Sequence, residues 1–302
     1  MTDDFPEMPD FDPKVTRKAV RRGLFRTTFS ALAIILVLVL AATFGSALAQ
    51  QRGDREQRMM DVLGTAFKLY NPAYTVTTGE CCETTPVSMS FEAFAAPLRA
   101  AGGFYPVGSD TYTISQDFFG RVGHLPMGST ANTRLAIALY DVGGTLAPKE
   151  DVRKVLASLP EGLNALAVVE FATPLAAAGL KAFLEQNESC AAKVVYERRT
   201  GSLPITWGDT TWDRGKFAEG KEPCGVGLGN FRSWVAKLRG YDNANLRRFD
   251  LSLSRLRKAA GDGLAYAYVD SRVSVKRLRE LIEDPRVRTI RLADATFDLD
   301  RP

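Results

Sequence analysis

The chain has 302 residues and a formal net charge of +4, and 45% of its residues are hydrophobic. That apolar content is ample for a folded core, and the length allows one large domain or two small ones. The net charge is too small to indicate nucleic-acid binding, so we expect no nucleic-acid partner.

Residues 1–13, MTDDFPEMPDFDP, are acidic and contain three prolines. The segment has too few apolar side chains to bury a core and is expected to be disordered in isolation. Two interpretations stay open. Either Phe5, Met8 and Phe11 anchor the tail on a basic groove of a partner protein, or the tail is solvated and only spaces the membrane anchor from its surroundings.

Residues Phe29–Ala49 carry no charge and no proline. A helix of that length rises about 30 Å, the thickness of the hydrocarbon core of a bilayer. The side richer in Lys and Arg stays in the cytoplasm, so we expect the N-terminus inside and the chain after about Gln50 outside the cell. The alternative is a signal sequence, since Ala47–Ala49 is a small-x-small cleavage pattern. The basic residues before the span are Lys14, Arg17, Lys18, Arg21, Arg22 and Arg26.

Four cysteines follow the span: Cys81, Cys82, Cys190 and Cys224. An even number in an oxidising compartment permits two disulfides. We expect Cys81 and Cys82 to pair with Cys190 and Cys224, because a bond between adjacent cysteines closes a small, strained ring. Free thiols and a metal site are the alternatives. No C-x-x-C spacing supports a metal, and we expect no cofactor.

The region after the span begins with a predicted amphipathic helix over residues 55–70, where apolar residues recur at helical spacing. Asn71 and Pro72 end this helix. Residues 71–133 are expected to be irregular, apart from a helix over Ser90–Ala101 and a strand near Tyr112–Ser115. The apolar residues of the first helix are Met59, Val62, Leu63, Ala66, Phe67 and Tyr70.

The distal region alternates between strand and helix patterns, which indicates an α/β or α+β sandwich. Strands are predicted over Thr133–Asp141, Asn164–Ala172, Ala192–Arg198, Gly263–Val269 and Val287–Phe297. Helices are predicted over Pro148–Ser158, Pro174–Gln186, Phe231–Arg239, Asn243–Ala259 and Ser274–Glu283.

A long loop is predicted over Ser202–Gly229, and a loop of this length is often functional. It contains Trp207, Asp209 and Trp212 in the sequence ITWGDTTW. Aromatic side chains beside a carboxylate can grip a ligand, and the alternative is that the indoles close the loop over a sheet. The sequence GVGLGN at 225–230 lacks the last glycine and the Lys-Ser or Lys-Thr pair of phosphate loops, so it is interpreted as a flexible turn.

The one histidine, His124, lies in GRVGHLPMGS. Any Ser-His-Asp or Cys-His mechanism would depend on it, and no G-x-S-x-G elbow accompanies it. We interpret it as a loop residue and do not expect an enzyme.

The order of these segments resembles bacterial sigma factor regulators. The N-terminal match is FDPKVTRKAVRRGLFRTTFSALAIILVLVL followed by LYNPAYTVTTG. The C-terminal match consists of TRLAIALYDVGGTLAPKEDVRKVLASLP, NALAVVEFAT, ITWGDTTW and GLAYAYVDSRVSVKRLRELIEDPRVRTIRLADATFD.

The resemblance implies a membrane-anchored regulator of an extracytoplasmic-function sigma factor. Residues 1–28 are then a cytoplasmic tail that contacts the sigma factor or a membrane anti-sigma partner, and residues 29–49 cross the cell membrane once. Residues 50–132 form an extracytoplasmic juxtamembrane region, and residues 133–302 form an exported C-terminal domain. The alternative function is a cell-envelope protein that binds a ligand or partner and carries a cleaved or uncleaved signal sequence.

Overall fold

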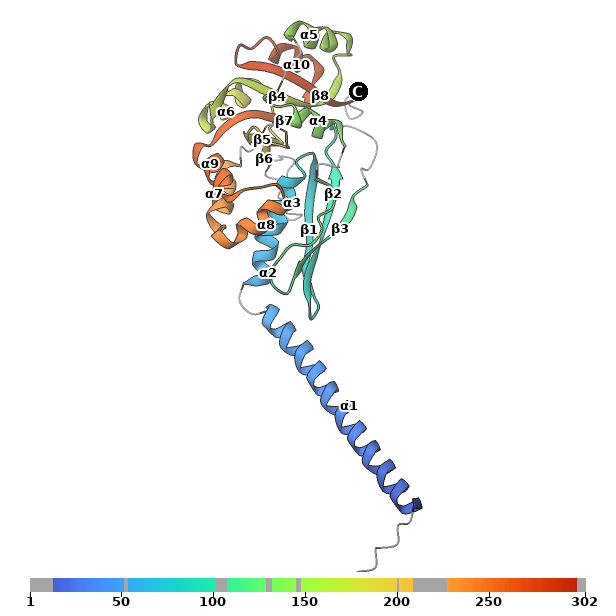
Figure 1. Cartoon of the computed structure of the whole chain (residues 1–302). Helices are drawn as coiled ribbons and strands as arrows, with labels where there is room; N and C mark the ends of the chain where they lie inside the picture. Colours follow the sequence, from blue (N-terminus) through green and yellow to red (C-terminus); the bar gives the residue numbers. More distant parts are fainter. Residues whose placement is uncertain are drawn as a thin grey trace, which may run out of the picture.

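A computed structural model of the chain contains a long N-terminal helix and two antiparallel sheets that carry helices (Figure 1). The fold is mixed α/β, as the sequence predicts. The structure describes residues 13–51, 54–101, 108–128, 132–144, 148–199, 201–208 and 227–297.

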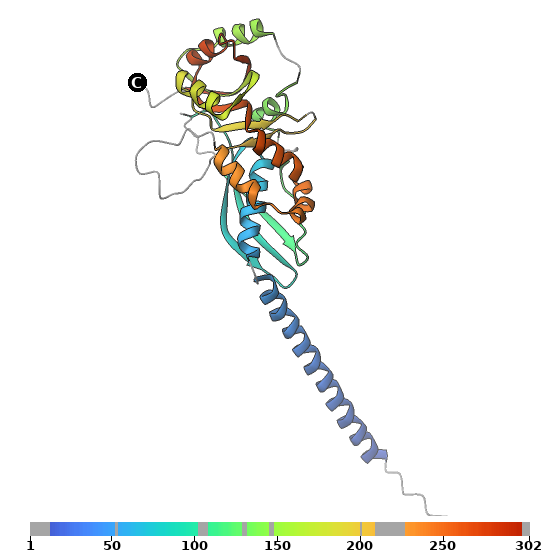
Figure 2. The same ribbon diagram turned by 90° about the vertical axis from the view of Figure 1, so that its left-hand side faces the viewer.

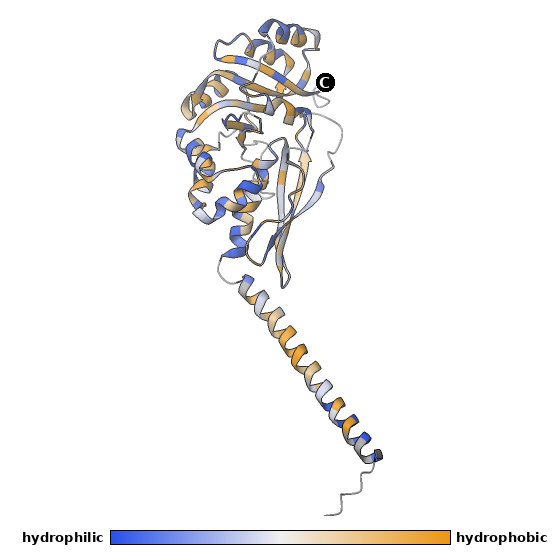
Figure 3. Ribbon diagram, in the orientation of Figure 1, coloured by the Kyte–Doolittle hydropathy of each residue, from blue (hydrophilic) through white to orange (hydrophobic). Residues whose placement is uncertain are grey.

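Helix α1 (Pro13–Gln51) extends away from both sheets (Figure 1). Its stretch Val20–Ser46 is long and apolar enough to cross a membrane, and it contains most of the predicted span Phe29–Ala49. Figure 3 shows the middle of α1 as hydrophobic, and the large apolar side chains of this stretch are exposed. A contiguous exposed apolar surface is typical of a site that meets a membrane or another protein.

The predicted amphipathic helix over residues 55–70 is confirmed. It consists of α2 (Arg55–Arg58), the π-helical segment η1 (Met59–Gly64) and α3 (Thr65–Tyr70), which follow one another without a break and are called the juxtamembrane helix here. Asn71 ends it as predicted, and its side-chain amide donates to the carbonyl of Phe67 at 3.0 Å. The buried apolar residues of the helix are Met59, Val62, Leu63, Ala66, Phe67 and Leu69.

The first sheet has the strand order β1-β2-β3, all antiparallel. Its strands are β1 (Tyr74–Thr84), β2 (Ser88–Pro97) and β3 (Asp110–Asp117). Strand β3 confirms the strand predicted near Tyr112–Ser115, but the helix predicted over Ser90–Ala101 is wrong. Buried residues recur along β2 with a period of two, which requires a strand. They are Met89, Phe91, Ala93 and Ala95.

The second sheet has the order β6-β5-β7-β4-β8, again with antiparallel neighbours. Four of its strands confirm sequence predictions, whereas β6 lies inside the predicted loop Ser202–Gly229. Strand β4 pairs on both sides, which explains its nearly continuous apolar run. The strands are β4 (Leu163–Ala176), β5 (Lys193–Glu197), β6 (Ile205–Trp207), β7 (Leu264–Ser274) and β8 (Val287–Phe297).

The strand predicted over Thr133–Asp141 is instead a helix, α4 (Arg134–Tyr140). The hydroxyl of Thr133 accepts a hydrogen bond from the amide of Ala136 at 3.0 Å and so caps the helix start. Leu135, Ala138 and Leu139 are buried while Ile137 is exposed. Burial at i, i+3 and i+4 is the helical pattern, so the apparent alternation of apolar residues was misleading.

The other helices surround the second sheet and the juxtamembrane helix (Figures 1 and 2). The helix predicted over Asn243–Ala259 is broken into two, and the other predicted helices are found with shifted ends. These helices are α5 (Lys149–Ser158), α6 (Ala177–Gln186), α7 (Leu228–Lys237), α8 (Asn243–Arg248), α9 (Leu253–Asp262) and α10 (Val275–Leu281), with a short 3-10 turn, η3 (Gly240–Asp242), before α8.

One hydrophobic core joins the two sheets. It includes Phe67 of the juxtamembrane helix, Phe91 of β2, Phe231 of α7 and Tyr268 of β7. The η1 segment contacts both β1 and α7, so the juxtamembrane helix lies between the first sheet and the C-terminal helices (Figures 1 and 2). The core therefore extends across the predicted boundary between residues 132 and 133.

Candidate functional site

Several predicted site residues lie outside the described part of the chain: Phe5, Met8, Phe11, Asp209, Trp212 and Cys224. Trp207 is described and ends β6. Its ring lies 5.1 Å from that of Phe231 and 5.8 Å from that of Trp234. Trp207 thus belongs to an aromatic cluster against α7, as the packing interpretation expects, and one edge also lines a small cavity of about 280 Å³.

The predicted disulfide pairing is wrong for Cys81 and Cys82, which are bonded to each other. They lie at an irregular stretch of β1, where the register with β2 shifts, and the Cys81 sulfur lies 3.7 Å from the carbonyl oxygen of Glu56. Cys190 is also disulfide-bonded, but it lies in the loop between α6 and β5, where its amide donates to the Asp270 carboxylate of β7. The fold therefore separates the two cysteine regions that the sequence analysis joined.

A cleft of about 440 Å³ opens between four segments that are distant in the sequence. Tyr70 ends the juxtamembrane helix at one side, and Ile137 and Tyr140 of α4 form another. Arg199 follows β5, and Asp250 lies in the turn between α8 and α9. Because its walls come from both halves of the chain, only the complete fold creates this cleft.

Arg199 is the most buried charged group of the cleft, with only 8% of its side chain exposed. One terminal nitrogen lies 2.8 Å from an Asp250 carboxylate oxygen, and the other donates to the carbonyl of Leu203 at 3.1 Å. Its Nε–H has no partner among the described residues, although the atom is buried. A guanidinium group carries five N–H donors. This one therefore has unused donor capacity beside an open cleft.

Asp250 adopts a left-handed conformation, with φ of +53°. Its amide donates to the Arg247 carbonyl, and the amide of Leu251 donates to the Leu246 carbonyl. This pair of bonds is a Schellman motif, which usually has glycine at the left-handed position. Aspartate tolerates this conformation better than most residues. Here it ends α8 and places a carboxylate on the buried Arg199.

Tyr70 and the turn at Gly128 form a fixed side of the cleft. The amide of Gly128 donates to the Asn71 side chain at 2.8 Å. A Cβ at Gly128 would lie 2.0 Å from the Tyr70 ring, and its φ is +71°, so only glycine fits there. Burial, together with the nearby Asp250 carboxylate, raises the pKa of the Tyr70 hydroxyl. The hydroxyl consequently stays a neutral donor at physiological pH.

The charge of the cleft is positive. Arg247 and Arg248 are exposed at its rim, and together with Arg199 they face the single carboxylate of Asp250. Guanidinium groups bind carboxylates and phosphates through paired hydrogen bonds. The arrangement suits an anionic ligand with an apolar part that meets Ile137 and Tyr140. His124 is not among the residues that line it. In the described part of the chain, no group of three or more potential ligands could hold a metal.

Sequence reasoning missed Arg199 and Asp250 as a pair. It singled out neither, because a lone arginine after a strand and a lone aspartate between helices carry no local signature. The one available signal was a helix end within RRFDLS. Apolar residues keep helical spacing across this run, so the sequence predicted one continuous helix over Asn243–Ala259.

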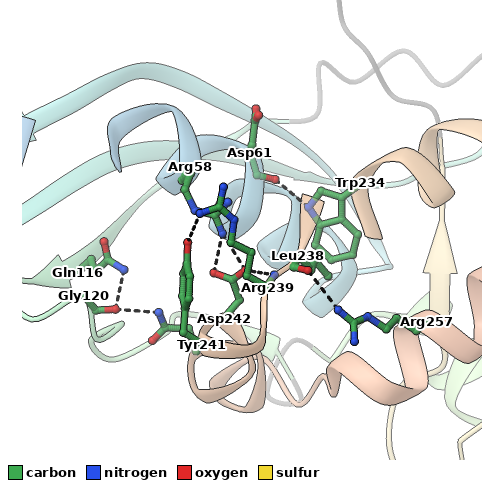
Figure 4. A network of polar contacts seen from close by, with 11 residues as sticks. Arg58, Asp61, Gln116, Gly120, Trp234, Leu238, Arg239, Tyr241, Asp242 and Arg257 are labelled. Carbon is green, nitrogen blue, oxygen red and sulfur yellow. Dashed lines mark hydrogen bonds and ion pairs between the residues drawn. The ribbon is translucent and has the colours of Figure 1, made fainter. Parts of the chain in front are cut away.

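The juxtamembrane helix is fixed to the C-terminal helices by polar contacts (Figure 4). Arg58 lies 2.8 Å from an Asp242 carboxylate oxygen and stacks over the Tyr241 ring at 5.2 Å. The indole of Trp234 donates to the Asp61 carbonyl at 2.8 Å. These contacts hold both the start and the middle of the helix whose last residue lines the cleft.

Comparison with known proteins adds no assignment. No family model matches the sequence, and no curated protein or solved structure is similar to it.

Proposed function

We propose that this chain is a single-pass membrane regulator of an extracytoplasmic-function sigma factor, acting directly or through a membrane anti-sigma partner. Residues 1–28 are the cytoplasmic part, and the two sheets with their helices are outside the cell. The proposal is supported by the apolar stretch Val20–Ser46, by the basic residues at and before its start, and by the order of segments that resembles sigma factor regulators.

One observation carries the proposal most directly: the juxtamembrane helix leads from the end of α1 to the cleft. It begins at Arg55, just after α1, and ends at Tyr70 in the cleft wall. All three of its segments contact β1, and its middle segment η1 also contacts α7. Close-packed elements transmit a displacement, because the interior has no free volume to absorb it. Binding of an anionic ligand beside Tyr70 would thus be felt at the membrane end.

The tail is tested by co-purification from detergent-solubilised membranes. The full chain is compared with a variant that carries Phe5→Ala, Met8→Ala and Phe11→Ala, and mass spectrometry identifies what is recovered. A sigma factor or anti-sigma protein recovered with the wild type and lost with the triple variant supports the proposal. Equal recovery from both removes these three residues as anchors, and recovery of no cytoplasmic regulator contradicts the proposal itself.

The cleft is tested by a reporter gene that depends on the recovered sigma factor. Arg199→Met removes the buried guanidinium group, and Arg153→Met in α5 is the control at an exposed arginine. We expect only the Arg199 variant to change reporter output at equal protein level in the membrane. Identical reporter output from both variants would show that the cleft plays no part in regulation of the sigma factor.

A second candidate function is a cell-envelope binding protein without a cytoplasmic partner. The positive charge of the cleft favours it, because Arg199, Arg247 and Arg248 can bind an anionic ligand without any part for the tail. This function predicts that deletion of residues 2–13 has no effect on phenotype, while Arg199→Met abolishes it. The regulator proposal predicts that both changes have an effect, so the two variants distinguish the functions.

A further inference from the structure

Three large apolar side chains are exposed at one end of the first sheet. Val87 lies in the turn between β1 and β2 and is 70% exposed. Phe118 and Phe119 follow β3 and are 39% and 82% exposed, with their rings in edge contact at 5.7 Å. The amide of Phe118 donates to the Val87 carbonyl at 2.8 Å, so the two turns form one unit. We call this unit the apolar tip.

The apolar tip is held against the end of α1. The Ser46 hydroxyl donates to the carbonyl of Pro86, and the Gln50 side chain donates to the carbonyl of Thr85 at 2.6 Å. From the start of the juxtamembrane helix, the Arg55 guanidinium donates to the carbonyls of Asp117 and Phe118, at 2.7 and 3.0 Å. The β1–β2 turn is therefore bonded to the last turns of α1, and the turn after β3 is bonded to Arg55, just after α1. Figure 1 shows the β1–β2 hairpin ending next to the end of α1.

These bonds fix the depth of the tip relative to the candidate span. Ser46 is the last residue of the apolar stretch Val20–Ser46. If Ser46 marks the outer end of the membrane-spanning part, Pro86 lies at that boundary and Val87 beside it. Apolar side chains such as phenylalanine bury at this depth, at the boundary between headgroups and acyl chains. Arg55 and the exposed Arg121 lie next to the rings and suit the phosphates of lipid headgroups.

We propose that the apolar tip inserts into the outer headgroup region of the same bilayer that α1 crosses. The occupant of this exposed apolar surface is thus phospholipid. The insertion gives the folded domain a second attachment, and it keeps the domain from rotating freely about the end of α1. This inference rests on the membrane span of the proposed function but not on any sigma factor.

The test places the photo-crosslinking residue p-benzoylphenylalanine at single positions of the full chain in phosphatidylglycerol–phosphatidylethanolamine nanodiscs. Phe119 reports the tip, and Leu36 in the middle of the apolar stretch reports the span. Phe297, 64% exposed at the end of β8, is the matched control for an exposed phenylalanine away from the tip. After irradiation, mass spectrometry counts chains that carry one phospholipid, and gel electrophoresis detects crosslinked pairs of chains.

We expect phospholipid adducts at positions 36 and 119, with at least about a tenfold excess of position 119 over position 297. Adducts at 36 with no excess at 119 would overturn the inserted tip and leave the span intact. Crosslinked pairs of chains at 119 would assign the tip to a second copy and overturn the proposal as well. No adduct at 36 would contradict the span, and with it both proposals.

Discussion

At the scale of single residues, the cleft depends on one ion pair between a buried and an exposed group. Arg199 is almost enclosed, whereas Asp250 is largely exposed and held in a left-handed turn. Removing the partner of a buried charge costs more than the pair itself contributes, because the remaining charge stays desolvated. Asp250 therefore supports both the shape and the charge balance of the cleft.

Asp250→Asn is expected to lower the free energy of unfolding by about 1–2 kcal/mol, because it removes the charge but keeps a residue that tolerates the left-handed conformation. The control is Asp262→Asn, which breaks the exposed pair with Lys258 at 3.0 Å. That change should cost at most about 0.5 kcal/mol. Urea unfolding of the chain in detergent measures both, and equal losses would contradict a special role for Asp250.

Lys193 makes stability depend on pH. Its ammonium group is buried and donates to the carbonyls of Pro72 and Tyr74, so it connects the second sheet to the turn before β1. Burial, assisted by the charge of Lys68, lowers the pKa of Lys193 to about 7. The unfolded chain keeps this proton up to about pH 10.4. The free energy of unfolding therefore rises as the pH increases from about 7 to about 10.4, and below pH 7, where both states hold the proton, Lys193 adds no pH dependence.

Lys193→Met should remove this trend. Between pH 7 and 9 the free energy of unfolding of the wild type is expected to rise more than that of the variant, whatever their difference at a single pH. Lys181→Met, at an exposed lysine of α6, serves as the control and should keep the wild-type trend. Parallel curves for the wild type and Lys193→Met would refute the assignment.

At the scale of elements, sequence patterns predicted the long and strongly periodic segments well. The juxtamembrane helix and the strands β4, β5, β7 and β8 are found where they were expected. Apolar spacing alone misassigned two shorter segments. In α4, the exposed Ile137 makes the apolar residues alternate as they would in a strand. In β2, Phe91 and Phe94 have the spacing of a helix, but pairing with β1 and β3 decides the conformation.

The cap of α4 offers a test at this scale. Thr133→Ala removes the acceptor of the Ala136 amide and should lower the free energy of unfolding by about 1 kcal/mol. Thr133→Ser keeps the hydroxyl and should cost clearly less. Thermal unfolding of both variants decides the matter, and equal losses would show that the Thr133 methyl group, not the cap, is what matters.

The candidate site was less predictable than the elements. Tyr70, Ile137, Arg199 and Asp250 come from four segments, and only tertiary packing brings them together. The pairing of the cysteines failed for the same reason, since the sequence does not reveal that Cys81 lies in the first sheet and Cys190 in a loop beside the second. A single sequence reveals local periodicity, but it does not reveal which distant residues become neighbours in the fold.

At the scale of the whole molecule, the end of α1 and the C-terminal helices are coupled through the juxtamembrane helix. Arg58 and Asp242 are 184 positions apart in the chain, and their ion pair is mostly shielded from solvent. Asp242 also accepts from the Arg239 amide at 2.6 Å, so its carboxylate fixes the turn before α8 while it holds the helix. The pair joins the start of the juxtamembrane helix to the segment that leads into the cleft.

A double-mutant cycle measures this coupling. Arg58→Met, Asp242→Asn and the double variant are unfolded in detergent, and the interaction free energy is expected to lie at about 1–3 kcal/mol, as for contacting groups in one network. The same cycle on Arg153 and Glu283, an exposed pair 2.7 Å apart, should give a clearly smaller interaction free energy. If the regulator proposal holds, Arg58→Met should also change output from the sigma-dependent reporter, because it loosens the helix between cleft and membrane. A coupling no larger than that of the exposed pair would mean that the juxtamembrane helix is held by apolar packing alone, and the path from cleft to membrane would then have to run through its contacts with β1.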